Sequence, residues 1–191
     1  EQAAAMLYAG PWVAERLAAV GDLINRNPDA THPVVRGILF GARGKTAVDA
    51  FQAFYRLADL IRTARSEWAK MDLLLLPTAP TTFTIAEMLS DPVELNSRLG
   101  VYTNFANLMD LAALAVPAGF RPDGIPFGVT VIGPALSDGV LASVGDVLHR
   151  SLGDWPLGAT PTPLSSTPPT RAETGTTKSV KVAAVGAHLS G

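Results

Sequence analysis

DLLLLPTAP, residues 72–80, is the stretch that decides the fold. Four consecutive leucines stand between Asp72 and Pro77. A short, uninterrupted apolar run bounded in this way is typical of a strand that is covered on both faces. Strands of that kind belong to sheets that carry helices on their faces. The run therefore predicts an α/β architecture.

Helical and strand-like patterns alternate on both sides of this run. Before it, residues 46–71 predict one long helix that Thr46 caps. Its most apolar face carries Phe51, Phe54, Tyr55, Ala58, Ile61 and Arg62. After the run, the patterns predict helical turns at 85–89 and 92–99, followed by a helix within 102–111. Two strands are expected next, at 111–120 and 126–134, joined by a Pro/Gly turn. A closing helix is expected at 137–152. Together these elements predict an α/β layered sheet.

The N-terminal part predicts a further helix after a Gly-Pro break. In LYAGPWVAER, residues 7–16, Pro11 suits the start of a helix because its missing N–H would be unpaired there anyway. The spacing of Val13, Leu17, Val20 and Ile24 predicts one buried stripe. The helix should end near residues 25–28. HPVVRGILFGARG, residues 32–44, is expected to be a loop with one helical turn.

Arg16 is the first candidate for a functional side chain. On a helical wheel it falls inside the apolar arc of its helix, and arginine is rarely buried without a partner. One interpretation is structural: the side chain reaches solvent or pairs with an internal carboxylate. The other is a substrate anchor, because the planar guanidinium binds a carboxylate through two hydrogen bonds and a helix N-terminus also favours an anion. Tyr8 either packs in the core or adds a hydroxyl hydrogen bond to the same ligand.

Composition excludes several classes of function. The net charge of −2 over 191 residues argues against electrostatic capture of nucleic acid or of an anionic membrane. With no cysteine, disulfides and thiol nucleophiles are excluded, which fits a reducing, cytoplasmic compartment. No apolar run has the roughly 20 residues of a membrane helix. The histidines are too far apart to suggest a metal site; His32 is expected to make a loop hydrogen bond and His149 to face solvent.

The chain is expected to comprise three parts. Residues 1–152 hold the patterned segments. Residues 153–179 are rich in Pro, Thr, Ser and Gly, and predict a linker. Residues 180–191 begin with a strand-like run, interpreted as the start of a truncated C-terminal domain. Because the chain begins without Met, we expect it to be a fragment.

Four segments in order resemble the amidase signature family. PDGIPFGVTVIGP (122–134) is similar to the C-terminal signature of that family, and DLLLLPTAP, the YTNF segment and LAALAVPAG follow the same order. LYAGPWVAER, HPVVRGIL and VYTNFANLMDLAALAVPAGF are most similar to the family's allophanate hydrolase branch. The resemblance covers nearly all residues except the linker. It implies a mixed sheet flanked by helices, of which this chain holds the C-terminal part.

The resemblance also implies an activity and a site. Such enzymes hydrolyse allophanate, the N-carboxylated form of urea, to ammonia and carbon dioxide with a Ser–cis-Ser–Lys triad. This chain has no matching Gly/Ser-rich loop or lysine, so the triad is expected upstream of Glu1 and the chain alone should be inactive. The family's substrate-binding tyrosine and arginine match Tyr8 and Arg16. No metal or organic cofactor is implied; the expected partners are the rest of the amidase domain, a C-terminal domain and a second copy in a homodimer.

Two alternatives remain open from the sequence. One is that the chain is part of another amidase signature enzyme that acts on a different amide, although a relative with a large apolar acyl pocket should lack the arginine. The chain also fits a non-catalytic, amidase-like scaffold subunit. Comparing the turnover of allophanate with that of neutral amides distinguishes the first alternative from an allophanate hydrolase. A Ser- and Gly-rich loop upstream of this chain, with a lysine some way before it, argues against the second alternative.

Overall fold

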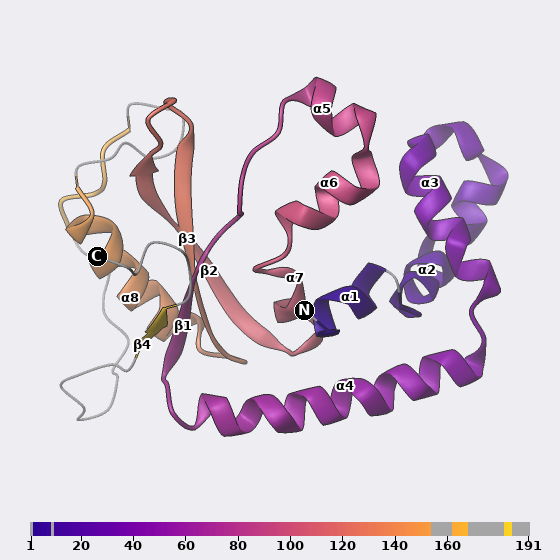
Figure 1. Cartoon of the computed structure of the whole chain (residues 1–191), viewed down its shortest axis with the longest axis horizontal. Helices are drawn as coiled ribbons and strands as arrows, with labels where there is room; N and C mark the ends of the chain where they lie inside the picture. The colour runs from indigo at the N-terminus through magenta and orange to yellow at the C-terminus, as the bar shows by residue number, and fades with distance from the viewer. Residues whose placement is uncertain (1, 9, 154–161, 168–181, 185–191) are drawn as a thin grey trace. The chain divides into compact units, whose positions relative to one another are not determined.

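The leucine run forms β1 (Leu73–Pro77), as the sequence predicts. The computed structural model describes residues 2–8, 10–153, 162–167 and 182–184. In it, β1 is an inner strand of a four-stranded sheet ordered β2-β3-β1-β4 (Figure 1). β2 (Leu111–Phe120) pairs antiparallel with β3 (Pro126–Pro134), and β3 pairs antiparallel with β1. β4 (Val182–Ala184) runs parallel to β1. The sheet is mixed, which confirms the predicted fold class.

The chain divides into two compact units that are discontinuous in sequence. A helical unit comprises residues 1–64 and 81–109, and a sheet unit comprises residues 65–80 and 110–191. The chain passes from the first unit to the second within one long helix and then returns after β1. Each unit is described by itself below.

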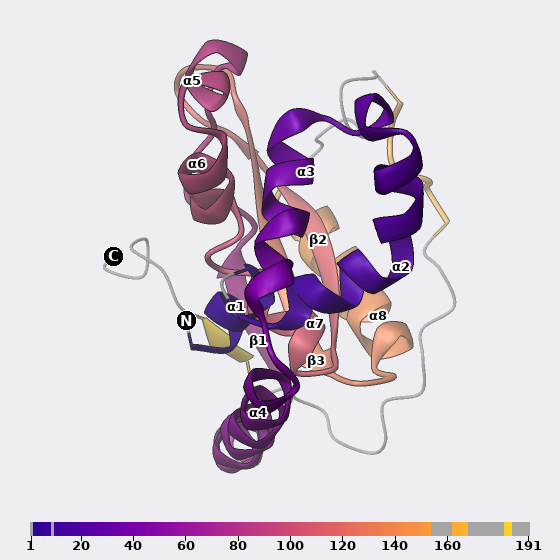
Figure 2. The same cartoon turned by 90° about the vertical axis from the view of Figure 1, so that its right-hand side faces the viewer.

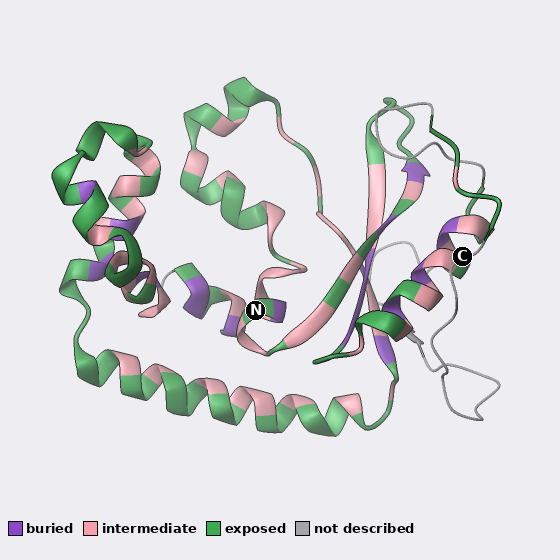
Figure 3. Ribbon diagram, turned by 180° about the vertical axis from the view of Figure 1, so that it is seen from behind, coloured by how far each residue is buried: buried purple, intermediate pink, exposed green. Residues whose placement is uncertain are grey.

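The core of the sheet unit lies between the strands and α8 (Asp138–Ser151), which packs on β2 and β3. Leu73, Val116, Val131 and Leu141 form its buried cluster. Leu73 and Leu76 are both buried. Because they are three positions apart, they face opposite sides of the sheet. Both faces of β1 are therefore partly covered, and Figure 3 shows buried residues on the strands and on α8.

The β2–β3 connection confirms the predicted turn at residues 121–125. Gly124 has a φ of 79°, a conformation that glycine adopts without a steric penalty. The Arg121 N–H donates to the Ile125 carbonyl over 2.8 Å, and the guanidinium of Arg121 pairs with Asp123 at 2.7 Å. The turn thus closes the hairpin with both backbone and side-chain contacts.

The helical unit contains seven α-helices among its described residues (Figure 2). They are α1 (Gln2–Tyr8), α2 (Trp12–Arg26), α3 (Pro33–Phe40), α4 (Ala47–Trp68), α5 (Ile85–Ser90), α6 (Pro92–Leu99) and α7 (Asn104–Leu108), with 3-10 turns at Pro28–Ala30 and Gly41–Gly44. The last four residues of α4 belong to the sheet unit. The positions of α2, α5, α6 and α7 agree with the sequence predictions.

The expectation of a single helical turn within residues 32–44 is wrong. α3 has eight residues, because Pro33 occupies its first turn and the Nδ1 atom of His32 caps it by accepting from the Val34 N–H at 3.3 Å. This contact confirms the predicted loop hydrogen bond of His32. Gly41 and Gly44 follow α3 and bound the next 3-10 turn.

The stripe predicted for α2 is buried only in part. Val13 and Ile24 are buried and Leu17 is half-buried, but Val20 remains 37% exposed. The helices and 3-10 turns that contact α2 within its unit do not cover Val20. α4 is capped by Thr46 as predicted: the Asp49 N–H donates to Thr46 Oγ1, and the Thr46 N–H donates to Asp49 Oδ2. Along α4, however, no residue is buried (Figure 3).

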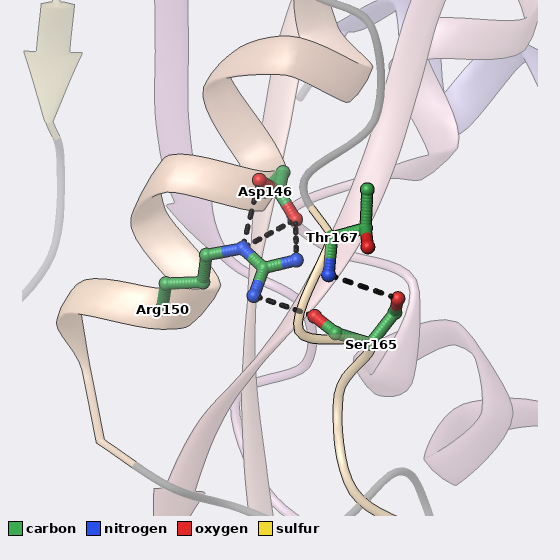
Figure 4. A network of polar contacts seen from close by, with 4 residues as sticks. All are labelled: Asp146, Arg150, Ser165 and Thr167. Carbon is green, nitrogen blue, oxygen red and sulfur yellow. Dashed lines mark hydrogen bonds and ion pairs between the residues drawn. The ribbon is translucent and has the colours of Figure 1, made fainter.

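The end of α8 differs from the sequence expectation at His149. Its side chain was expected to face solvent, but the residue is 8% exposed, because the last turn of α8 packs inward at this position. One position later, Arg150 forms an ion pair with Asp146 and donates from Nη1 to the Ser165 carbonyl over 2.8 Å (Figure 4). The hydrogen bond from Arg150 to Asp146 raises the pKa of the guanidinium. This network attaches residues 162–167 to α8.

The predicted linker and C-terminal domain fall mostly outside the described residues. Of residues 153–191, only 153, 162–167 and 182–184 are described. The described part of the terminal strand-like run is β4, which has a partner in β1. The division at residues 153 and 180 stays a prediction. Within the described ranges, no helix is both long and apolar enough to cross a membrane.

Candidate functional site

A tight turn places the end of α1 against the start of α2. A Cβ atom at Gly10 would collide with the carbonyl oxygen of Met6, so only glycine permits this approach of the two backbones. Pro11 then sets the first turn of α2, and its carbonyl accepts from the Ala14 N–H at 2.9 Å. The Gly-Pro pair therefore ends one helix and starts the next within three residues.

Both helices are held by apolar contacts. On α1, Met6 and Leu7 are buried, and the helix packs against α7. On α2, the ring of Trp12 meets Phe54 of α4 edge to face, with 5.3 Å between the ring centroids. Each of the two helices thus packs against a neighbouring helix of the same unit.

This arrangement brings the two predicted site residues together. Tyr8 is the last residue of α1, and Arg16 lies in the second turn of α2. The Cζ atom of Arg16 lies over the Tyr8 ring, 5.1 Å from its centroid. That distance is within the range of a cation–π interaction. Arg16 is half-buried, and Tyr8 is 38% exposed.

The guanidinium of Arg16 has no ion pair or hydrogen bond with any residue in the described part of the chain. Two other arginines of the helical unit have such partners, whereas Arg98 resembles Arg16 in having a ring contact, with Phe83 at 5.4 Å, as its assigned side-chain interaction. Arg36 donates to the Pro28 carbonyl at 2.7 Å, and Arg43 donates to Asn25 Oδ1 at 2.9 Å while lying over the Phe40 ring. An internal carboxylate partner, one of the two forms of the structural interpretation of Arg16, is therefore not found among the described residues, whereas a half-buried side chain is compatible with the other form, in which it reaches solvent.

The surroundings of Arg16 favour an anion. It lies near the positive end of α2, where no side chain caps the helix. Its planar set of N–H donors matches the two oxygens of a carboxylate. The arrangement can thus bind a carboxylate in front of a ring face, but it contains no nucleophile or base of its own.

Several serine and lysine side chains in the described part of the chain have assigned contacts with backbone carbonyls or with a carboxylate. Four serine hydroxyls donate to backbone carbonyls within their own helices: Ser90, Ser97, Ser143 and Ser151. Lys70 pairs with Glu67 at 2.8 Å. Across residues 2–8, 10–153, 162–167 and 182–184, no group of three or more His, Asp or Glu side chains could hold a metal ion.

Sequence reasoning missed the ring contact of Arg16 and two polar features of the sheet unit. Thr130 Oγ1 donates to Thr78 Oγ1 over 2.9 Å, which links β3 to the end of β1. The hydroxyl of Ser137 and the Nε2 atom of His149 are buried with no hydrogen-bond partner among the described residues. Both lie in or next to α8, and the polar character of that helix gave no sign of their burial.

Comparison with known proteins places the chain among amidases. The sequence model of the family described as Amidase matches residues 25–141, more than half of the chain; Tyr8 and Arg16 precede the match. The urea amidolyase of Saccharomyces cerevisiae is 38% identical over 195 residues, which cover 97% of this chain and 10% of that protein. The urea amidolyase of Lachancea kluyveri is 42% identical over 142 residues, 73% of this chain and 8% of that protein.

Comparison with solved structures also places the chain among amidases. The allophanate hydrolase of Kluyveromyces lactis superposes with a TM-score of 0.75 at 40% identity, over 79% of this chain and 25% of that chain. The chain thus spans about a tenth of the curated relatives and a quarter of the solved one. The resemblance identified from the four sequence segments is confirmed, and the chain belongs to the amidase family.

Proposed function

We propose that this chain is the substrate-recognition part of an enzyme that hydrolyses allophanate to ammonia and carbon dioxide. The proposal is supported by the similarity to urea amidolyases and to an allophanate hydrolase. The observation that carries it is the Tyr8–Arg16 pair, in which a half-buried guanidinium lies over a ring and has no acidic partner in the described residues.

In this proposal Arg16 binds the carboxylate of allophanate through two charged hydrogen bonds, with Tyr8 beside it in the same site. A carboxylate bound in this way orients the rest of a small planar substrate. The amide carbon is then held for attack from outside this chain. Binding and orientation of this kind contribute to catalysis by placing the reacting atoms correctly.

The bond-breaking chemistry is assigned to the remainder of the amidase domain, outside this chain. A Ser–cis-Ser–Lys triad there would supply the nucleophile and its base, and backbone N–H groups would stabilise the oxyanion. The chain alone would be inactive. The full protein would also contain a C-terminal domain and act as a cytoplasmic homodimer without a metal or organic cofactor.

The experiment compares charged and neutral substrates in the full-length protein. Arg16→Ala should lower kcat/KM for allophanate by about 30-fold or more, because a charged hydrogen-bonded pair of at least ~2 kcal/mol is lost. Turnover of malonamide, a neutral amide, should change little. Arg43→Ala is the matched control, since it removes another ring-stacked arginine of the same unit that already has a partner.

Different results would point to the alternatives. Equal losses on both substrates would assign Arg16 to structure rather than to carboxylate recognition. If the unmodified full-length protein hydrolyses malonamide but not allophanate, the enzyme acts on a different amide. Absence of turnover on either amide would support a non-catalytic scaffold.

A further inference from the structure

We infer that the C-terminal half of α8 is a docking surface for a later segment of the same chain, residues 162–167, and that the planar guanidinium of Arg150 holds that segment in place. These six residues are named the strap. The inference is independent of the proposed function, because it involves neither Tyr8 nor Arg16. It changes the interpretation of the predicted linker at residues 153–179, since part of that linker is attached to a helix.

One guanidinium binds two partners at once (Figure 4). The Nε atom of Arg150 donates to both carboxylate oxygens of Asp146 at 2.9 Å, and Nη2 lies 2.9 Å from Asp146 Oδ1. The remaining arm, Nη1, donates to the Ser165 carbonyl over 2.8 Å. Because the group is planar and rigid, its pairing with Asp146 directs Nη1 toward the strap. The Asp146–Arg150 pair therefore acts as a clamp.

The clamp is partly shielded from solvent. The side chain of Arg150 is 30% exposed and that of Asp146 is 18% exposed, whereas the Arg62–Asp59 pair on α4 is 75% and 63% exposed. Fully exposed ion pairs contribute little, because water screens the charges and two long side chains must be ordered. Partial burial weakens the screening, so the orientation of the Arg150 guanidinium is better defined than that of a surface pair.

The strap itself is suited to docking. Leu164 is half-buried while its neighbours are exposed, and removing an apolar side chain from water favours the docked state. The Thr167 N–H donates to Ser165 Oγ at 3.2 Å, which forms a local turn next to the anchored carbonyl. Pro163 has a restricted φ, so the chain loses fewer conformations when it is held.

Docking of the strap determines where the chain departs from the helix. With the strap held, the chain departs from α8 after residue 167, and with the strap released it departs after residue 152. A chain can span at most about 3.3–3.6 Å per residue. The clamp therefore shortens the reach of everything that follows the strap, including the predicted C-terminal domain.

The test is limited proteolysis of the folded full-length protein with proteinase K, with the cleavage sites located by mass spectrometry. Arg150→Ala should speed cleavage within residues 162–167 by about threefold to tenfold, as expected when a hydrogen bond to a charged group is lost and cleavage follows the open population. Arg150→Lys should also speed it, because lysine still pairs with Asp146 but has no planar fork to reach the strap. Arg62→Ala is the control, since it breaks an ion pair of the helical unit and should leave strap cleavage unchanged.

Cleavage within Asp138–Ser151 separates release of the strap from damage to α8. The inference expects faster cleavage of the strap and an unchanged rate within the helix. It is overturned if Arg150→Ala speeds cleavage in both segments to the same extent, because Arg150 would then stabilise the helix only. It is also overturned if strap cleavage does not change in Arg150→Ala, or if the strap of Arg150→Lys is cleaved as slowly as that of the unmodified protein.

Discussion

Gly10 lies where the backbone between Tyr8 and Arg16 approaches Met6 too closely for a side chain. Replacing it by alanine would place a Cβ atom against the backbone of Met6, at its carbonyl oxygen, and backbone cannot move aside as a side chain can. We expect Gly10→Ala to destabilise the full-length protein by about 1–3 kcal/mol, the usual cost of forcing extra atoms into a packed place. Thermal or denaturant unfolding measures this change. Turnover of allophanate should fall as well, because Tyr8 would move relative to Arg16.

Gly37→Ala is the control for this substitution. Gly37 lies within α3, and a Cβ atom added there would meet no atom within 4 Å. Alanine is the better helix former by up to about 1 kcal/mol, so this variant should be neutral or more stable. If Gly10→Ala were as stable as Gly37→Ala, the close approach of α1 and α2 would not constrain the turn.

Arg16 and His149 show how far the sequence predicts the burial of a single side chain. The wheel position of Arg16 correctly predicted a side chain that is not fully exposed, and the half-buried state agrees with it. Its contact with Tyr8 was not derivable from periodicity, because the ring belongs to a different helix. His149 was placed wrongly for a related reason. Near the end of a helix, burial depends on which tertiary neighbour covers the last turn.

Two helices have reciprocal caps that make their first turns sensitive to acid. In α5, the Thr84 N–H and hydroxyl both donate to Glu87 Oε2, at 2.8 Å and 2.7 Å. The backbone hydrogen bond, and then the side-chain one, hold the pKa of Glu87 below its ordinary value. Asp49 at the start of α4 has its pKa lowered by the same contacts with Thr46. A group with a lowered folded pKa stabilises the folded state above its unfolded pKa.

We therefore expect the first turn of α5 to loosen as the pH falls through the lowered pKa of Glu87. Protonation removes the charge that the two donors favour, and no loosening is expected between neutral pH and the ordinary pKa of a glutamate. Hydrogen exchange of residues 84–90, corrected for intrinsic exchange rates, measures the effect. Glu87→Gln is the control, because glutamine still accepts in this capping position but does not titrate. Identical pH profiles in the two proteins would exclude Glu87 as the titrating group.

The sequence predicted the existence of the elements better than their ends and their packing. β1, β2 and β3 were recognisable because uninterrupted apolar runs and a Pro/Gly turn are local signals. α3 was underestimated because residues 32–44 were interpreted as a loop, although Pro33 suits the first turn of a helix and the single glycine within α3, Gly37, is tolerated at a moderate cost. On α4, periodicity identified an aromatic face, yet Phe51 is 60% exposed and Tyr55 is 68% exposed. Periodicity indicates which residues share a face, but not whether another element covers it.

The division of the whole chain into two units was not predictable from local pattern. The sheet unit contains β1 and then resumes only at residue 110, so its core joins residues far apart in sequence. The order of four segments nevertheless identified the family, because that order extends over residues 72–134 and does not depend on one local pattern. The match over residues 25–141 confirms it. Family membership was thus easier to predict from this sequence than the arrangement of its units.

The proposed function separates substrate recognition in this chain from bond cleavage elsewhere in the protein, and this separation can be tested on the whole chain. Four serine hydroxyls of α5, α6 and α8 donate to backbone carbonyls of their own helices. Lys70 forms an ion pair with Glu67. A serine nucleophile needs a base within hydrogen-bond reach, and the acceptors assigned to these serine hydroxyls are backbone carbonyls, which are not bases. We expect the purified 191-residue chain to release no ammonia from allophanate above the uncatalysed rate, while the full-length protein does so. Circular dichroism of the chain must first show folded helix and strand, so that inactivity is not merely unfolding. Ammonia release by the folded chain alone would place the nucleophile within it, and the assignment of the triad to another part of the protein would be wrong.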